Sequence, residues 1–160
     1  MPPKSPPSPP AETAIRAGRD RVVQFSVFLR NKVGAFLDVV NVLRDHHVHV
    51  LGTTVEPSAD TAIVRIVVSD PEAVEGIFHL NAIPYSTWPL IVVELKEAAH
   101  FSEVLTALLA AEVNIYGAYA LLTRPHGHAT LALHVEDNEC AESVLMGSGF
   151  IILNQDDLSR

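Results

Sequence analysis

The stretch LRNKVGAFLDVV, residues 29–40, lies where one hydrophobic periodicity gives way to another. Before it, VVQFSVFL (residues 22–29) alternates along its length, which is the pattern of a half-buried strand. After Gly34 the apolar side chains recur at spacings of three and four, which is the pattern of an amphipathic helix. These side chains are Phe36, Val39, Val40 and Leu43. The stretch therefore predicts a strand, a glycine turn and a helix.

The same pattern occurs a second time further along the chain. When the sequence is compared with itself at an offset of 65 residues, the first predicted helix and the strand after it align with similar residues. From residue 62 onwards the same holds at an offset of 67. The matched pairs include Phe36 and Phe101, Leu43 and Leu108, Gly52 and Gly117, Ile66 and Leu133, and Asp70 and Asp137. A duplication of this length predicts two copies of one structural unit.

Each copy reads in the order βαββαβ. In the first copy VHVLGTTVEP and AIVRIVVS are strands joined by a hairpin turn, with Arg65 facing out. DPEAVEGIFHL is a helix with Asp70 as its N-cap and Pro71 at its first position, and IPYSTW (residues 83–88) is a short closing strand. This order predicts an α+β fold of two ferredoxin-like sandwiches, each with both helices on one face of an antiparallel sheet.

The expected domains are residues 21–88 and residues 89–160, preceded by a tail. Units of about 70 residues bury little surface alone, so the two should pack on each other, with Trp88 across the join.

Six of the eleven prolines lie in residues 1–10. That composition predicts a disordered tail over residues 1–20, with a peptide ligand of SH3-type domains as the alternative.

Charge and composition exclude several classes of partner. The net charge of −8 is unsuited to nucleic acid as a main partner and to an anionic membrane surface. No apolar run approaches the roughly 20 residues of a membrane span, and the first residues lack the apolar block of a secretory signal. Cys140 is the only cysteine, so no intrachain disulfide forms. We therefore expect a cytoplasmic protein without nucleic-acid or membrane partners.

With this element order and RNKVGAF at the first strand–helix junction, the chain resembles the small stand-alone proteins made of two ACT domains in tandem. The family pattern at this junction is Asp/Asn-x-x-Pro-Gly-x-Leu; Asn31 and Gly34 fit it, whereas Val33 stands where proline is usual. The second copy has KEAAHF, without the proline or the glycine. The resemblance implies a regulatory protein that binds an amino acid or another small metabolite between paired domains, and that is not an enzyme.

The candidate ligand site lies at this first junction. The first amides of a helix lack helical partners and carry the positive end of the helix dipole, so they stabilise a docked carboxylate. A glycine there removes the Cβ that would block close approach, although it also serves a turn with no ligand. Asn31 is expected to cap the helix or to bind the ligand. The candidate ligand-binding residues here are Asn31, Lys32, Val33, Gly34, Ala35 and Phe36.

The edge strands are expected to supply the other wall of the site. Gly52 and Gly117 lie inside the second strand of each unit, where a glycine often marks a bulge or a close backbone approach. In the ferredoxin-like order this second strand lies at an edge of its sheet, where its unpaired backbone groups could pair with another chain. We therefore expect the two edge strands to meet, within one chain or in a homodimer. The strand residues that would then face the first junction are Thr53, Thr54, Ala118 and Tyr119.

Other motifs are weaker. The second junction is one residue shorter and has Ala99 where Gly34 stood, so we expect a poorer site there. DHHVHV, residues 45–50, together with His126, His128 and His134, raises a metal-binding alternative, but solvent-facing turn positions explain these residues equally well, and we expect no metal site. No nucleophile–base pair or phosphate-cradling loop is evident, so we expect no catalytic residue and no cofactor. The alternative function is a dimerising adaptor whose ligand sites have decayed.

Overall fold

The computed structural model describes residues 21–159, and every structural statement below concerns these residues. The tail predicted over residues 1–20 lies outside them. Within residues 21–159 no helix has the length and apolar character that a membrane span requires.

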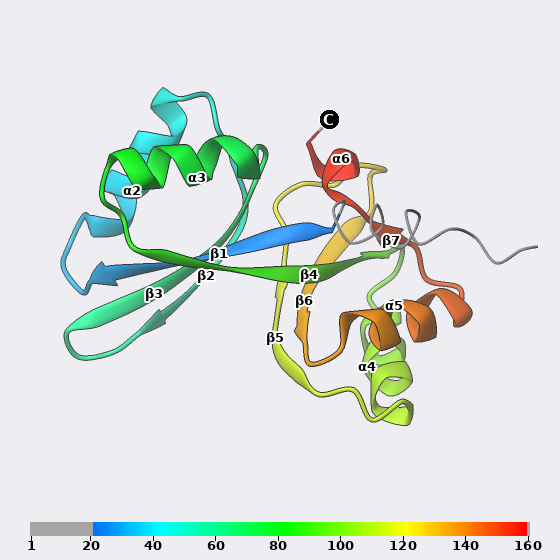
Figure 1. The fold of residues 1–160 in the computed structure, drawn as a ribbon. Helices are drawn as coiled ribbons and strands as arrows, with labels where there is room; N and C mark the ends of the chain where they lie inside the picture. The colour runs from blue at the N-terminus through cyan, green and yellow to red at the C-terminus, as the bar shows by residue number, and fades with distance from the viewer. Residues whose placement is uncertain (1–20, 160) are drawn as a thin grey trace, which may run out of the picture.

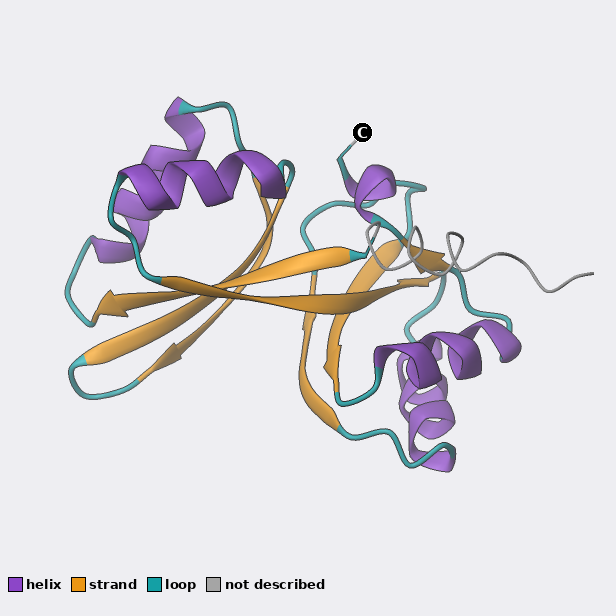
Figure 2. Ribbon diagram, in the orientation of Figure 1, coloured by secondary structure: helices purple, strands orange, loops and turns teal. Residues whose placement is uncertain are grey.

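The order βαββαβ occurs twice, and the α+β fold of two ferredoxin-like units is confirmed (Figure 1). Helices α2 and α3 cover one face of the first half of the sheet, and α4 and α5 cover the second half (Figure 2). The elements are β1 (Val22–Arg30), α2 (Ala35–Asp45), β2 (Val50–Pro57), β3 (Thr61–Val68), α3 (Pro71–Leu80), β4 (Tyr85–Leu95), α4 (His100–Ala110), β5 (Ile115–Ala120), β6 (Ala129–Val135), α5 (Asn138–Gly147), β7 (Ile152–Leu153) and α6 (Gln155–Leu158).

Matched capping residues begin the second helix of each unit. The side chain of Asp70 accepts a hydrogen bond from the backbone N–H of Ala73 at 3.0 Å. Asp137 does the same for Cys140 at 2.9 Å. Each carboxylate satisfies one amide that the helix leaves without a partner and lies at the positive end of its dipole. The predicted N-cap at Asp70 is confirmed, and the duplication extends to the capping chemistry.

One strand joins the two units. The sequence predicts a short strand ending at residue 88, but β4 continues from Tyr85 to Leu95 and crosses the join (Figure 1). Its first part pairs with β1 and its second part pairs with β6, so the strand order is β2-β3-β1-β4-β6-β5. The reason is that an antiparallel ladder continues wherever both ends of a strand find a partner. The expected boundary between residues 88 and 89 falls inside this strand and stays a prediction.

Three hydrophobic cores result. One lies between α2, α3 and the first half of the sheet, and a second between α4, α5 and the second half. The third lies on the opposite face of the sheet, where the two halves meet. Its buried members are Val22, Val67, Leu90, Val92, Leu121, Ala132, Leu153 and Leu158. In β3 this explains the consecutive buried residues Ile66, Val67 and Val68, because alternate positions serve different cores.

The sheet curls until its two edge strands approach each other. Gly52 of β2 forms an isolated antiparallel bridge with Leu121, and the N–H of Leu122 donates to the carbonyl of Leu51 at 2.6 Å. The register also shifts beside Gly52 and beside Gly117, as the strand glycines predicted. The two edges therefore meet at one end within a single chain.

Candidate functional site

The turn that precedes α2 leaves the start of this helix open. Gly34 is the N-cap, with φ of 87°, in the left-handed region that favours glycine. No side chain of the described residues caps the helix, and a Cβ built on Gly34 would meet nothing within 4 Å. The N–H of Ala35 donates to the carbonyl of Lys32 at 3.3 Å, and that of Asp38 donates to the carbonyl of Gly34 at 3.0 Å. The amides at this helix start that remain for an anion are therefore those of Phe36 and Leu37.

Asn31 does not make the predicted cap, and its predicted contact with a ligand stays a prediction. Its side-chain Nδ2 donates to the carbonyl of Ser58 at 2.8 Å, and its backbone N–H donates to the carbonyl of Asp60 at 3.0 Å. These bonds tie the loop to the β2–β3 turn, and Asn31 does not cap α2. The expectation of a cap was wrong because the hairpin turn, which is distant in sequence, offers nearer partners.

A groove of about 330 Å³ begins beside Gly34, between the end of β1, α2 and the loop after α3. Its polar lining consists of Arg30, Lys32 and Asp38, together with Asn81. Two cations with one carboxylate match a zwitterion, whose carboxylate would lie towards the cations and the helix start, and whose ammonium would lie towards Asp38. Phe28 and Ile83 add apolar surface.

Two of the six predicted residues of the junction line this groove, and Asn31, Val33, Gly34 and Phe36 do not. Lys32 and Ala35 line it. Val33 is fully exposed, and Phe36 packs against the first core. The sequence did not indicate Arg30, Asp38, Asn81 or Ile83 as site residues. A signal for Asp38 was present, because a residue four positions after Gly34 lies one helical turn from the start of the helix.

The second unit has an equivalent but smaller groove, of about 170 Å³. His100 stands where Ala35 does in the first unit, and its ring contacts Phe150 edge-on, with 5.9 Å between centroids. The charges differ too, since Lys96 is accompanied by Glu94 and Glu103. The second groove is thus narrower and richer in carboxylates, and both differences disfavour a bound carboxylate.

The predicted edge-strand residues lie elsewhere. Thr54, Ala118 and Tyr119 line a small cavity between the two halves, to which none of residues 31–36 contributes. The hydroxyl oxygen of Thr53 is buried and has no hydrogen-bond partner among the described residues. Within one chain, the two predicted groups therefore form two separate sites.

The cavity between the halves is lined by a polar group that lacks a hydrogen-bond partner. The Nε2 atom of His134 is buried without a partner in the described part of the chain. Its ring lies against Trp88, which thereby packs across the join as expected, with ring centroids 4.6 Å apart. Burial lowers the pKa of His134, and the positive charge of Arg65 lowers it further.

Acidification is therefore expected to destabilise the protein through His134. Because its pKa in the folded state is below the ordinary 6.5, the unfolded chain binds the proton more readily. The stability that comes from the neutral ring is fully present above the unfolded-state pKa of about 6.5, and it is lost as the pH falls from there through the lower pKa of the folded state. Urea denaturation at pH 7.5 and pH 5.5 should show a smaller pH dependence in His134→Gln than in wild type; an equal dependence would assign the effect to other groups.

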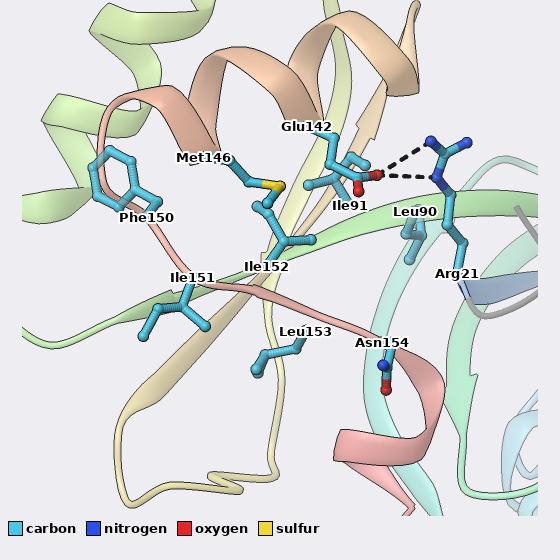
Figure 3. Close-up of a pocket in the computed structure, with 10 residues that line it drawn as sticks. All are labelled: Arg21, Leu90, Ile91, Glu142, Met146, Phe150, Ile151, Ile152, Leu153 and Asn154. Carbon is cyan, nitrogen blue, oxygen red and sulfur yellow. Dashed lines mark hydrogen bonds and ion pairs between the residues drawn. The ribbon is translucent and has the colours of Figure 1, made fainter. Parts of the chain in front are cut away.

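A fourth hollow, of about 460 Å³, lies between β4, α5 and residues 150–154 (Figure 3). Its lining is mostly apolar, with Met146, Ile152 and Leu153 among the contributors. Arg21 and Glu142 face each other at one end, and Arg21 Nη2 lies 3.1 Å from Glu142 Oε2 (Figure 3). The two charged residues of this lining bind each other, so the hollow suits a carboxylate less well than the groove beside Gly34.

The histidines do not assemble into a metal centre. His46 ends α2 and His47 follows in the turn, as the sequence indicated. His126 Nδ1 lies 3.1 Å from Oε2 of the buried Glu94, and His128 Nε2 lies 3.7 Å from its other oxygen. In the part of the chain that the structure describes, no group of three or more histidine, cysteine, aspartate or glutamate side chains is placed to hold a metal ion.

Comparisons with known proteins agree with this architecture. The family model "ACT domain pair" matches residues 21–160. Among solved structures, protein BT0572 from Bacteroides thetaiotaomicron is 22% identical, with a TM-score of 0.80, over 88% of this chain and 97% of that one. The ligand-free regulatory subunit of aspartate kinase from Thermus thermophilus is 13% identical, with a TM-score of 0.57, over 81% of this chain and 91% of that one. At these identities the likeness concerns the fold. No curated protein matches the sequence.

Proposed function

The chain belongs to the ACT domain pair family, and from this premise we propose that it is a non-catalytic regulatory module that binds an amino acid in the groove beside Gly34. The observation that carries the proposal is the uncapped start of α2, where a glycine in a left-handed conformation faces open space. Here the ligand carboxylate accepts hydrogen bonds from the first amides of the helix. Arg30 and Lys32 add positive charge, and Asp38 receives the ammonium group.

Regulation follows if the ligand prefers one arrangement of paired domains. A ligand stabilises a paired state only as far as it binds that state more tightly. In the proposed homodimer, the loop of residues 31–36 faces an edge strand of a second copy, at Thr53 and Thr54 or at Ala118 and Tyr119. Of these residues, Thr54, Ala118 and Tyr119 already line the cavity between the halves of their own chain, so they would meet the second copy from the edge of that cavity. The amino-acid-binding role of these residues is part of the proposal, as is the cytoplasmic setting.

Replacing Gly34 with alanine is expected to weaken amino-acid binding at least tenfold. A methyl group would stand where the carboxylate approaches, and a left-handed conformation disfavours any side chain. Binding is measured by isothermal titration with each of the twenty amino acids, and by thermal shift, since a ligand at 100 times its Kd stabilises by about 2.7 kcal/mol.

Gly127→Ala is the matched control. Gly127 also has a positive φ, of 78°, with nothing within 4 Å of a built Cβ. Residues close to Gly34 in the chain, Lys32 and Ala35, line the groove, whereas no neighbour of Gly127 does. The control carries the same backbone strain and should bind like wild type. Absence of both heat and thermal shift in wild type with all twenty amino acids would contradict the proposal, as would equal weakening by the two variants.

The alternative function is a dimerising adaptor without a ligand. Two exposed aliphatic side chains beside the groove favour it, since Val33 is fully exposed and Leu37 is 60% exposed. Large apolar side chains that face solvent side by side are typical of interaction surfaces. Light scattering separates the two functions: the adaptor is a dimer whose mass and stability are unaffected by amino acids, whereas in the regulatory module a bound amino acid shifts the monomer–dimer equilibrium.

A further inference from the structure

The cavity between the two halves of the sheet contains groups that a purely structural join would not need. It has a volume of about 150 Å³ and lies on the face of the sheet opposite the helices. β1, β2 and β3 contribute Gln24, Thr54 and Arg65, and β5 and β6 contribute Tyr119 and His134. Residues from both halves of the chain are therefore required to form it.

Arg65 brings a positive charge into this cavity. Its Nη1 donates to Oε2 of Glu56 at 2.8 Å, and its side chain is 29% exposed, against 65% for Glu56. A guanidinium group has five N–H donors in a planar fork, and the bond to Glu56 uses one of them. The remaining fork matches the two oxygens of a carboxylate.

His134 adds a buried polar atom that lacks a partner. Its Nε2 is inaccessible to solvent and makes no hydrogen bond in the described part of the chain. Leaving such an atom without a partner costs about 1–3 kcal/mol, and buried polar atoms in native proteins are normally bonded to protein, water or ligand. The lowered pKa of His134 keeps the ring neutral at pH 7.5, so that it carries a single N–H, and the tautomer with this N–H on Nε2 is the one that donates to a carboxylate.

Two further polar residues that line the cavity, Tyr119 and Gln24, already bond to each other. The hydroxyl of Tyr119 donates to Oε1 of Gln24 at 2.9 Å, and Gln24 is 1% exposed. Burial raises the pKa of Tyr119 above its usual range, so the hydroxyl stays protonated. The polar groups left for a guest are therefore Arg65 and His134, with the hydroxyls of Thr54 and Tyr116 beside them. Glu56 also lines the cavity, and its carboxylate is paired with Arg65.

We propose that this cavity is a second binding site, for a small carboxylate held by the guanidinium of Arg65 and the imidazole of His134. A cavity of about 150 Å³ accommodates a benzene-sized guest of about six non-hydrogen atoms, which sets the size of an enclosed ligand. The site lies within one chain and stands whether or not the groove beside Gly34 binds an amino acid. Because both halves line it, an occupied cavity favours the arrangement in which they are closed together.

Trp88 makes the proposal directly measurable. It is the only tryptophan of the chain, and its ring contacts that of His134. Titration at pH 7.5 and constant ionic strength with sodium acetate, and separately with glycine, is expected to change the fluorescence of Trp88 saturably. Acetate tests the carboxylate alone, and glycine tests whether an ammonium group is accepted beside Glu56.

Arg65→Gln is expected to raise the Kd for acetate at least tenfold, because it removes the charge that pairs with the carboxylate. Arg44→Gln is the matched control, since Arg44 pairs with a neighbouring carboxylate on α2 and its side chain is 69% exposed. It should leave the Kd unchanged. Arg65→Lys keeps the charge but loses the planar fork, so its Kd should lie between those of wild type and Arg65→Gln.

Two results would overturn the proposal. If neither acetate nor glycine changes the fluorescence or the melting temperature of wild type, the cavity holds water only. If Arg65→Gln or Arg65→Lys binds acetate as wild type does, the carboxylate lies elsewhere. Gly34→Ala separates this site from the first: the response of Trp88 should persist in that variant even where amino-acid binding at the groove is lost.

Discussion

Replacing Phe78 with alanine should lower the free energy of unfolding by about 3–5 kcal/mol. Phe78 is fully buried in the first core, where its ring lies 5.9 Å from that of Phe25 and 5.4 Å from that of Tyr85, measured between centroids. Truncation removes the transfer free energy of the ring and leaves a cavity that two neighbouring aromatic rings fill poorly. Urea denaturation measures the loss.

The variant also tests whether the two halves unfold together. β4 pairs with β1 over Tyr85–Leu90 and with β6 over Ile91–Leu95, and the third core joins both halves. We therefore expect a single transition, with far-UV circular dichroism and the fluorescence of Trp88 changing at the same urea concentration. A second transition at the wild-type midpoint would show that β4 does not couple the halves.

Leu80→Ala is the control for this prediction. Leu80 lies in the same helix but is 83% exposed, so its truncation should change stability by no more than about 0.5 kcal/mol. If Phe78→Ala proves too unstable to purify, Phe78→Leu should show a smaller loss of the same kind. A loss in Phe78→Ala no larger than that in Leu80→Ala would contradict the packing described here.

The second large effect is expected at Gly52. A Cβ built on Gly52 overlaps the Cδ2 methyl of Leu121 and lies 3.4 Å from its Cα. Leu121 is 7% exposed and belongs to the third core, so its methyl group moves only at the expense of that packing. Overpacking of this kind typically destabilises by about 1–3 kcal/mol, and we expect Gly52→Ala to do so in thermal and urea denaturation.

Gly117→Ala provides an unusually close control. Gly117 is the equivalent residue of the second unit, beside the equivalent bulge, yet a Cβ there would meet only His134 Cβ, at 3.9 Å. Neither glycine has a positive φ, so alanine can adopt the backbone conformation at both positions. An alanine restricts the unfolded chain, and at Gly117, where nothing is overpacked, this should raise the free energy of unfolding by about 0.4–1 kcal/mol. The two variants should thus change stability in opposite directions. Equal effects would show that Gly52 has no special role in bringing the edges together.

The two grooves show how similar sequences can lead to unequal sites. The sequence predicted the first junction to be the better one, from Gly34 and from the shorter second loop. The structure adds a reason that loop length could not supply, because the second groove is narrowed by the contact between His100 and Phe150. These side chains are 50 positions apart, and their contact depends on how α4 lies against the loop after α5.

Local periodicity by itself determined the elements, their order and their duplication. Alternation and helical spacing act within a few residues, so the strand before Gly34, the helix after it and the caps at Asp70 and Asp137 could be read directly. The family follows from the same features together with the RNKVGAF motif. The turn at Gly34 was also accessible, because it depends on one turn of backbone, whereas the N-cap was expected at Asn31 and lies at Gly34.

Only the tertiary structure decided what covers each face. Alternation placed Arg65 away from the helices of its own unit, which reads as exposure to solvent, but the second half of the chain lies over that face and makes Arg65 part of a cavity with His134. The continuity of β4, the third core and the use of Asn31 by the β2–β3 turn were missed for the same reason. Periodicity reports which side of an element a residue occupies, whereas the partner on that side is set by contacts between segments far apart in sequence.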